Sequence, residues 1–382
     1  MNIFISIIRK LLLLPSLVIK PKKVITFCSY PAFTDNAYGI YKYIKEAEFY
    51  KDYRLVWIVL DPKDCKKENI PVEIIHDDLL VLYKKSFLAV WYYLRSKYIF
   101  ITHGLYSNIP VSRPNTIINL WHGMPLKCIG VMDHKGKRYM ANSQILIATS
   151  EKFQELMAQS FAKSLEDVLV IGQPRNDLMF VETDFYEKMG IQKSDYESIG
   201  IWLPTFRSST IGDIRVDGLY NEGQISFLDF KMLQELDGFL VQNKKLLIVK
   251  LHPMDKLQEY EFSEFSNLLI IKQNDFKSQL YPLLGSTDYL LTDYSSVWID
   301  YDILSKPIGF VMNDVEEYKE SRGLTFQNLD QELPGKMIEN VDALKEFISE
   351  PDKFIVRTGD EFNKYKDNKS SERLMSYLKN KN

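Results

Sequence analysis

One pattern of hydrophobic and polar positions repeats along most of the chain. Short apolar runs rich in β-branched and aromatic residues end at polar corners, and segments with helical spacing follow. Such runs predict strands that are buried on both faces, as in parallel sheets. The predicted strands are residues 22–29, 54–60, 98–102, 116–121, 145–150 and 168–172, and then 199–203, 246–251, 267–271, 289–292 and 307–311.

The alternation of strands and helices is interrupted once, by a polar segment that contains Gly190 and Gly200. A chain of 382 residues is too long for one ordinary core, so we expect two domains. The predicted fold class is α/β, with two Rossmann-like, doubly wound domains facing a cleft. The expected parts are an apolar and basic terminal helix at 1–21, one domain at 22–195, a second at 196–350 and a helical tail at 351–382.

Helix starts are indicated by capping residues at two places. Ser150 followed by Glu151 predicts the cap and first turn of one helix. In the tail, Ser370 or Ser371 is the expected cap of the last helix.

The composition is that of a globular protein, with 46% hydrophobic and 26% charged residues. A net charge of −3 gives no reason to expect nucleic acid as a partner. Cys28, Cys65 and Cys128 are scattered, without a CxxC pair, which favours a reducing compartment over disulfides or a structural zinc site. We therefore predict no metal site.

The first residues raise the question of a membrane. Residues 3–19 are strongly apolar, but Arg9, Lys10 and Pro15 interrupt them, so a spanning helix is disfavoured. A small-residue cleavage site is missing from this stretch. A basic, apolar helix suits the surface of an anionic leaflet, and packing against its own domain is an equal alternative.

Candidate chemistry falls where the predicted strands end. His122, Arg207, His252 and the pair Ser295–Ser296 each follow an apolar run. In open parallel sheets, ligands bind outside the carboxyl ends of the strands. Four motifs that obey one positional rule predict a site more strongly than any of them alone.

Three of these motifs suit a diphosphate. Ser295 and Ser296 at a helix start add hydroxyl donors where an anion is already favoured. Arg207 offers a planar fork for phosphate oxygens, and Pro253 restricts His252 at its strand end. The alternatives are a serine that only caps its helix, a surface arginine and a structural histidine.

His122, in the sequence WHGMP, is the candidate base. Gly123 permits close backbone approach, so the ring is expected to project into the cleft. An unperturbed imidazole titrates near ~6.5, which suits a base at neutral pH. His103 is a second candidate in less organised surroundings, whereas His76 and His134 are expected at the surface.

Several enzyme classes are disfavoured because their motifs are missing. The sequence has no GxGxxG and no GxxxxGK[ST], which argues against dinucleotide dehydrogenases and P-loop phosphotransferases. It has no HExxH, and Ser295 has no GxSxG setting, which argues against zinc enzymes and α/β-hydrolases.

Six motifs together resemble one family. LWHGMPLKCIG, IGQPRNDLM, WLPTFR, KLHPMD, LLTDYSSVWIDY and PIGFVMNDVEEYKESRGL occur in the order found in CDP-glycerol glycerophosphotransferases. These enzymes include teichoic-acid primases and polymerases and their capsule-making relatives. The resemblance covers residues 24–325 and implies a glycosyltransferase-B architecture with the active site in the interdomain cleft. It also implies that the C-terminal domain binds the CDP-alditol and that the N-terminal domain faces the acceptor.

The resemblance also implies residue roles. His122 becomes the base on the acceptor hydroxyl, with His252 as the second catalytic histidine. The residues implied to hold or orient the pyrophosphate are His252, Arg207, Ser295, Ser296 and Asp293. Asn36, Gly123, Arg175, Asp177 and Arg322 are implied to lie near the cleft, without a defined role.

The implied reaction is attack by the acceptor oxygen on the phosphorus next to glycerol, with CMP leaving. Such transfers depend mainly on positioning and charge stabilisation. No cofactor is required, and a phosphate-bound divalent cation stays open. The implied partners are CDP-glycerol or CDP-ribitol, a lipid-linked saccharide or polyol-phosphate chain, and the inner face of the cell membrane, where the protein would be peripheral.

Two positions depart from the family pattern and leave alternatives open. Met124 stands where threonine is common, and Gln173 replaces a tyrosine. A CDP-ribitol-dependent transferase, a glycosyltransferase that uses a nucleotide sugar, and a membrane-associated assembly factor without catalysis are the alternatives. Primase and polymerase activity are equally compatible with the sequence.

Overall fold

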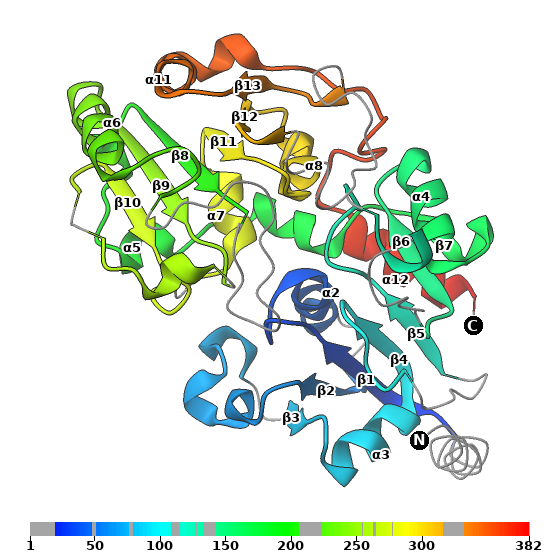
Figure 1. The fold of residues 1–382 in the computed structure, drawn as a ribbon. Coiled ribbons are helices and arrows are strands. Elements are labelled where there is room, and N and C mark those ends of the chain that lie inside the picture. The colour runs from blue at the N-terminus through cyan, green and yellow to red at the C-terminus, as the bar shows by residue number, and fades with distance from the viewer. Residues whose placement is uncertain are drawn as a thin grey trace, which may run out of the picture. The chain divides into compact units, whose positions relative to one another are not determined.

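Two parallel β-sheets form the framework of the protein in the computed structural model (Figure 1). One unit comprises Met1–Met124, Gly130–Leu178 and Asp367–Asn382, and the other Pro125–Ile129 and Met179–Lys366. The division after Leu178 precedes the boundary expected at residue 195. The structure describes residues 20–47, 51–75, 79–107, 115–126, 128–132, 142–205, 224–253, 255–262, 265–276, 278–315 and 332–381.

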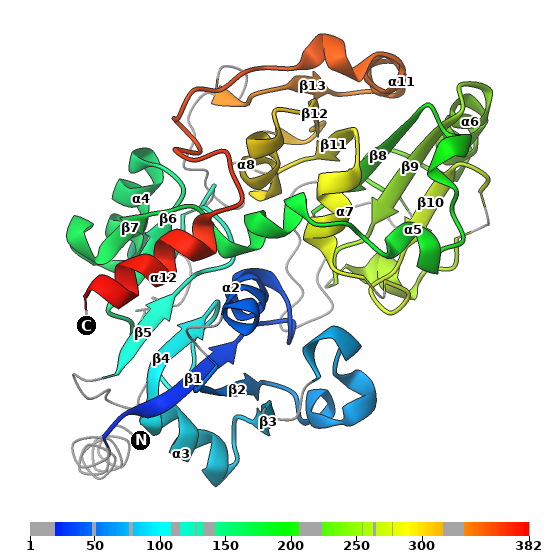
Figure 2. The ribbon, with the colours of Figure 1, turned by 180° about the vertical axis from the view of Figure 1, so that it is seen from behind.

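The first unit contains a seven-stranded sheet in the order β3-β2-β1-β4-β5-β6-β7, with all pairs parallel. Helices α2 and α12 contact each other, and Figure 2 shows them from behind. The strands are β1 Lys22–Cys28, β2 Arg54–Val59, β3 Leu80–Tyr83, β4 Ser96–Ile101, β5 Thr116–Asn119, β6 Ile145–Ala148 and β7 Val168–Val170. The helices are α2 Asp35–Glu46, α3 Phe87–Arg95, α4 Glu151–Phe161 and α12 Ser370–Asn380.

Strand β1 shows why the predicted strands are continuously apolar. Successive side chains of a strand point to opposite faces. Val24 and Cys28 join the core cluster beneath α3. Between them, the ring of Phe27 stacks on that of Trp57, with centroids 5.5 Å apart, and meets the ring of Tyr41 of α2 edge-on, with centroids 5.3 Å apart. Both faces of the strand are therefore covered.

The two predicted caps have opposite outcomes. Ser150 caps α4 as predicted, because its hydroxyl oxygen accepts a hydrogen bond from the Phe153 amide at 3.4 Å. The prediction for the tail helix is wrong. The Asp177 carboxylate instead accepts from the amides of Ser370 at 2.9 Å and Ser371 at 2.8 Å. The capping group comes from a distant part of the chain, so local sequence does not reveal it.

The second unit contains a six-stranded parallel sheet in the order β10-β9-β8-β11-β12-β13. On one face, Leu233 and Leu236 of α6 and Phe347 of α11 pack against the strands. On the other face, Trp298 of α8 meets Phe310 of β12 edge-on at 6.0 Å. The elements are α5 Phe185–Lys188, β8 Ser198–Leu203, α6 Phe230–Gln242, β9 Lys245–Lys250, β10 Leu268–Ile271, α7 Leu280–Ser286, β11 Tyr289–Thr292, α8 Val297–Tyr301, β12 Ile308–Val311, β13 Lys336–Ile338 and α11 Val341–Ser349.

Short 3₁₀ helices occupy many of the connections between these elements. They lie at Pro62–Cys65, Lys67–Asn69, Val72–Ile74, Gly130–Met132, Leu165–Asp167, Pro174–Phe180, Lys193–Asp195, Lys256–Glu259, Asp302–Leu304 and Pro351–Phe354.

These two parallel sheets, covered by helices, confirm the predicted α/β fold class of two Rossmann-like domains. Sequence reasoning missed β3 and β13, each of which lies at the edge of its sheet. Within the described ranges, no helix has both the length and the apolar character needed to cross a bilayer. The predicted terminal helix at 1–21 falls almost wholly outside those ranges, which begin at residue 20.

We predict that Gly39→Ala destabilises the first unit. Gly39 of α2 is buried against the backbone of residue 174, and an added Cβ would lie 2.4 Å from the Pro174 carbonyl oxygen. Forcing helix and backbone apart is expected to cost ~1–3 kcal/mol of unfolding free energy. The measurement is the midpoint of urea denaturation.

Gly238→Ala is the matched control for this substitution. Gly238 is exposed in α6, and no atom lies within 4 Å of its added Cβ. Alanine at such a helical position is expected to be neutral or to stabilise by ~0.5–1 kcal/mol. Equal denaturation midpoints for the two variants would contradict the close packing of α2.

Candidate active site

His122 lies just after β5 on an unusual backbone. The residue before it, Trp121, has φ 51°, and Gly123 has φ 137°, a conformation that L side chains rarely adopt. Nδ1 of His122 lies 3.2 Å from the carbonyl oxygen of Thr102. Because a carbonyl only accepts, Nδ1 carries the hydrogen, and Nε2 of the neutral ring keeps a free lone pair.

His103 belongs to the same cluster, which corrects the expectation of less organised surroundings. Its ring stacks on that of His122, with centroids 4.4 Å apart and planes 9° apart. The hydroxyl of Thr102 lies 2.9 Å from Nδ1 of His103, while the carbonyl of Thr102 holds His122. The pairing arises because β4 and β5 are neighbours in the sheet, so their carboxyl ends lie side by side.

Both histidines have depressed pKa values. The pKa of His103 is lowered from 6.5 to about 4: burial is the largest cause, the neighbouring His122 adds to the lowering, and Asp35 opposes it. Burial is also the main cause that lowers the pKa of His122; Asp35 and the Thr102 carbonyl raise it, and Arg175 lowers it. The residue His122 as a whole is nonetheless exposed to solvent. The ordinary imidazole pKa expected from the sequence is thus too high, and the ring is neutral at pH 7.

Asn36 ties together three separate chain segments behind His122. Its Nδ2 lies 3.2 Å from the Leu120 carbonyl, 3.1 Å from the Trp121 carbonyl and 3.1 Å from Oε1 of Gln173. Its Oδ1 accepts from the amide of Arg175 at 3.1 Å. Asn36 is fully buried, and these hydrogen bonds fix the backbone before His122. Gln173 supplies one of the acceptors in this network.

Arg175 fixes the backbone of the histidine itself. Its Nη1 donates to Oδ1 of Asp35 at 2.7 Å and to the carbonyl oxygen of His122 at 3.0 Å. The two charged side chains are 7% and 11% exposed, so the ion pair is largely desolvated. Removing only one partner of such a pair is strongly destabilising, because the other charge is left buried without a counter-charge. Asp177, from the same motif, caps α12 instead.

In the second unit, the predicted phosphate residues follow adjacent strands. β9, β8 and β11 are neighbours, so the residues after their carboxyl ends share one edge of the sheet. Asp293, after β11, accepts from the amide and the hydroxyl of Thr205, both at 3.0 Å. Asp293 therefore joins the ends of β8 and β11.

The serine pair lies between β11 and α8. Oγ of Ser295 accepts from the Val297 amide at 3.4 Å, and Ser296 makes no side-chain capping bond. Both serines are partly exposed, so their hydroxyl hydrogens can be donated outward. α8 has only five residues, so the hydroxyls matter more here than the helix dipole.

His252 follows β9, and its backbone is fixed by two contacts. Its carbonyl accepts from the Asp255 amide at 3.0 Å and from Nε2 of Gln258 at 2.9 Å. Sequence reasoning missed Lys250, two residues earlier. This lysine is buried, its Nζ lies 3.0 Å from Oε1 of Gln273, and burial lowers its pKa to about 8. The signal was a lysine at the end of the otherwise apolar run LLIVKL.

Four residues with a predicted role or location are not placed by the structure. The candidate site residues Arg207 and Arg322, and the expected surface histidines His76 and His134, lie outside the described residues. In the part of the chain that the structure does describe, no group of three or more His, Cys, Asp or Glu side chains is arranged to hold a metal ion.

Comparison with known proteins gives consistent matches. Residues 12–380 match the family described as CDP-Glycerol:Poly(glycerophosphate) glycerophosphotransferase. The chain is 26% identical to the teichoic acid poly(glycerol phosphate) polymerase of Bacillus spizizenii, over 86% of this chain and 83% of that protein. It is 26% identical to the teichoic acid glycerol-phosphate primase of Bacillus subtilis, over 95% and 93%. The structure of the wall teichoic acid polymerase TagF matches with a TM-score of 0.74 at 22% identity, over 100% and 95%, which supports the fold.

We predict that His103→Phe makes the unfolding free energy less dependent on pH below pH 6.5. A neutral His103 stabilises the folded protein fully above pH 6.5, and this contribution is lost as the pH falls toward 4. The difference between the pKa of 6.5 for an ordinary histidine and about 4 for His103 in the folded protein corresponds to about 3 kcal/mol of unfolding free energy between these pH values. Phenylalanine keeps a stacked ring and does not titrate, so the variant should lose less unfolding free energy between pH 6.5 and 4. Identical pH profiles in urea denaturation would show that His103 is not buried as a neutral ring.

Proposed function

Because the chain belongs to the CDP-glycerol:poly(glycerophosphate) glycerophosphotransferase family, we propose that it transfers glycerol phosphate from CDP-glycerol to a hydroxyl group and releases CMP. The acceptor in this proposal is a lipid-linked saccharide or a growing polyol-phosphate chain. The family match confirms the resemblance seen in the six motifs. Similarity to a glycerol-phosphate polymerase and a glycerol-phosphate primase supports this donor.

The observation that carries the catalytic proposal is the hydrogen bond from His122 to the Thr102 carbonyl. It fixes the tautomer in which Nε2 is free to accept a proton. The depressed pKa keeps that nitrogen unprotonated at neutral pH. In the proposed step, Nε2 takes the proton of the acceptor hydroxyl while its oxygen attacks the phosphorus next to glycerol. The bond from that phosphorus to the CMP oxygen breaks.

The environment of His122 also suits the charged state that the reaction creates. Asp35 and the Thr102 carbonyl both favour the protonated ring. The proton gained from the acceptor is therefore stabilised by groups that are already in place, as in preorganised sites. Arg175 opposes this charge, which helps the ring return to neutrality after transfer.

The second unit supplies the proposed donor-binding groups. Ser295 and Ser296 would donate hydroxyl hydrogens to the diphosphate, and His252 would stabilise the charge of the departing CMP. The carboxylate of Asp293 already accepts hydrogen bonds from Thr205. We therefore assign Asp293 the role of fixing the ends of β8 and β11, and not of contacting phosphate. Arg207 and Arg322 remain predicted contributors.

A lipid-linked acceptor implies work at a membrane surface. We propose that the protein acts peripherally at the inner face of the cell membrane. The apolar and basic sequence of residues 1–19 supports this location, since such segments favour anionic leaflets.

We predict that His122→Asn lowers kcat for transfer by ~10²–10⁴-fold, because the positioned base is lost. The assay is CMP release from CDP-glycerol in the presence of a lipid-linked saccharide. Circular dichroism and the urea midpoint serve as controls for folding. Near-normal turnover in a folded variant would refute the assigned base. Parallel reactions with CDP-ribitol and UDP-sugars test the donor, since faster nucleotide release from either would replace CDP-glycerol in the proposal.

We predict that Ser295→Ala combined with Ser296→Ala lowers kcat/KM for CDP-glycerol by about tenfold or more, because hydrogen bonds to charged phosphate are lost. Ser349→Ala is the matched control in the same unit. Ser349 is exposed, and its hydroxyl donates to the Lys345 carbonyl at 2.8 Å. An unchanged kcat/KM in the double variant would remove the serine pair from the donor site.

A further inference from the structure

Helix α3 presents an apolar face to solvent. On its inner side, Ala89 and Tyr93 are fully buried in the core beneath the sheet. On its outer side, the exposed fractions are 84% for Phe87, 45% for Leu88 and 36% for Trp91. A surface helix of a globular protein normally turns polar residues outward. A cluster of exposed large apolar side chains marks an interaction surface.

This face is carried by a well-anchored helix. Oγ of Ser86 accepts a hydrogen bond from the Ala89 amide at 3.1 Å and so caps the first turn of α3. The guanidinium carbon of Arg95 lies 5.0 Å from the centroid of the Trp91 ring. The apolar side chains are therefore displayed at fixed spacing, one turn apart from Phe87 to Trp91.

The charged residues that flank α3 in sequence are all basic. Lys84 and Lys85 precede α3, Arg95 ends it and Lys97 follows. The sequence has no aspartate or glutamate from residue 79 to residue 132. Aromatic and aliphatic side chains bordered by lysine and arginine are the composition that binds an anionic lipid surface.

The start of the described chain lies at the same place. Lys22 of β1 pairs in register with Ser96, the residue directly after α3. The described part of the chain, which begins at residue 20, therefore starts close to the carboxyl end of α3.

We propose that the outer face of α3 docks on an anionic lipid bilayer. Phe87, Leu88 and Trp91 enter the boundary between headgroups and acyl chains, while the flanking basic side chains contact lipid phosphates. A second copy of the chain is a weaker occupant, since a symmetric contact would bring the basic residues of two identical faces into one interface without acidic partners from residues 79–132. The inference rests on the proposed function only for the expectation of a lipid-borne acceptor.

Trp91 provides a direct test of insertion. The full chain is mixed with phosphatidylglycerol–phosphatidylcholine vesicles whose acyl chains carry bromine, which quenches nearby tryptophan. We expect quenching of the wild type and loss of that quenched component in Trp91→Phe, which keeps an apolar ring and should still sediment with vesicles. Equal quenching in both proteins would show that Trp91 stays outside the bilayer and would overturn the proposal.

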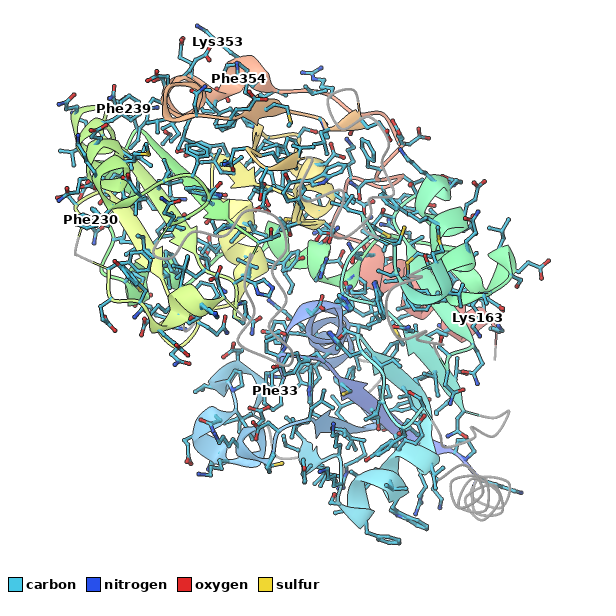
Figure 3. All side chains as sticks on the ribbon, viewed as in Figure 1. Phe33, Lys163, Phe230, Phe239, Lys353 and Phe354 are labelled. Carbon is cyan, nitrogen blue, oxygen red and sulfur yellow. The ribbon has the colours of Figure 1, made fainter. Side chains whose placement is uncertain are left out.

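A pair of substitutions tests the contribution of the face to binding. Phe87→Ser combined with Leu88→Ser should lower partitioning onto phosphatidylglycerol-containing vesicles by about tenfold or more, because two apolar side chains no longer leave water. The matched control is Phe230→Ser with Val241→Ser on α6, whose residues are 42% and 46% exposed; Figure 3 labels Phe230. That control should bind vesicles like the wild type.

Two outcomes would contradict the docking surface. One is unchanged vesicle binding by the Phe87/Leu88 variant. The other is self-association of the wild type without lipid, seen in sedimentation and removed by the same substitutions. All variants retain residues 1–19, so any effect belongs to α3. Vesicle binding is measured without substrates, and CMP release with a water-soluble acceptor is measured separately, so failure of docking is distinguishable from failure of the transfer proposal.

Discussion

The buried amide of Asn36 is the interaction on which the geometry of the first unit depends. It joins the start of α2, the end of β5 and the segment 173–175, which are far apart in sequence. A buried amide left without partners costs ~1–3 kcal/mol, so these three segments are held together. Gly39 lets α2 approach the same segment closely. The conformation of the His122 loop is thus set by residues that need not touch a substrate.

Opposite charges are balanced around that loop. Asp35 and Arg175 form a nearly buried pair, and each acts on the His122 ring with the opposite sign. Burial outweighs both, so the two stacked imidazoles are neutral at physiological pH. The His122 ring is therefore unprotonated before the reaction, and the carboxylate of Asp35 stabilises the ring once it has accepted a proton. In the second unit, Lys250 brings positive charge close to the strand end that carries His252.

Sequence reasoning succeeded where one physical rule fixes the answer. Strands buried on both faces appear as continuous apolar runs, and the residues after them reach one edge of each sheet. The edge strands β3 and β13 are short and partly buried, so they leave a weaker pattern. Contacts between segments that are far apart in sequence could not be predicted from local patterns. The stacking of His103 on His122 needs the pairing of β4 with β5, and the cap of α12 needs Asp177.

The return of the tail has a consequence for biosynthesis. Leu374, Met375 and Leu378 of α12 are buried in the first unit, although all of Met179–Lys366 belongs to the second. A nascent chain therefore completes the amino-terminal core only after the carboxyl-terminal domain has left the ribosome. Until then, α2 lacks its contact with α12, and the carboxylate of Asp177 lacks the two amides that donate to it. Although domains generally fold from the amino terminus onward, the first unit of this chain is the last to be completed.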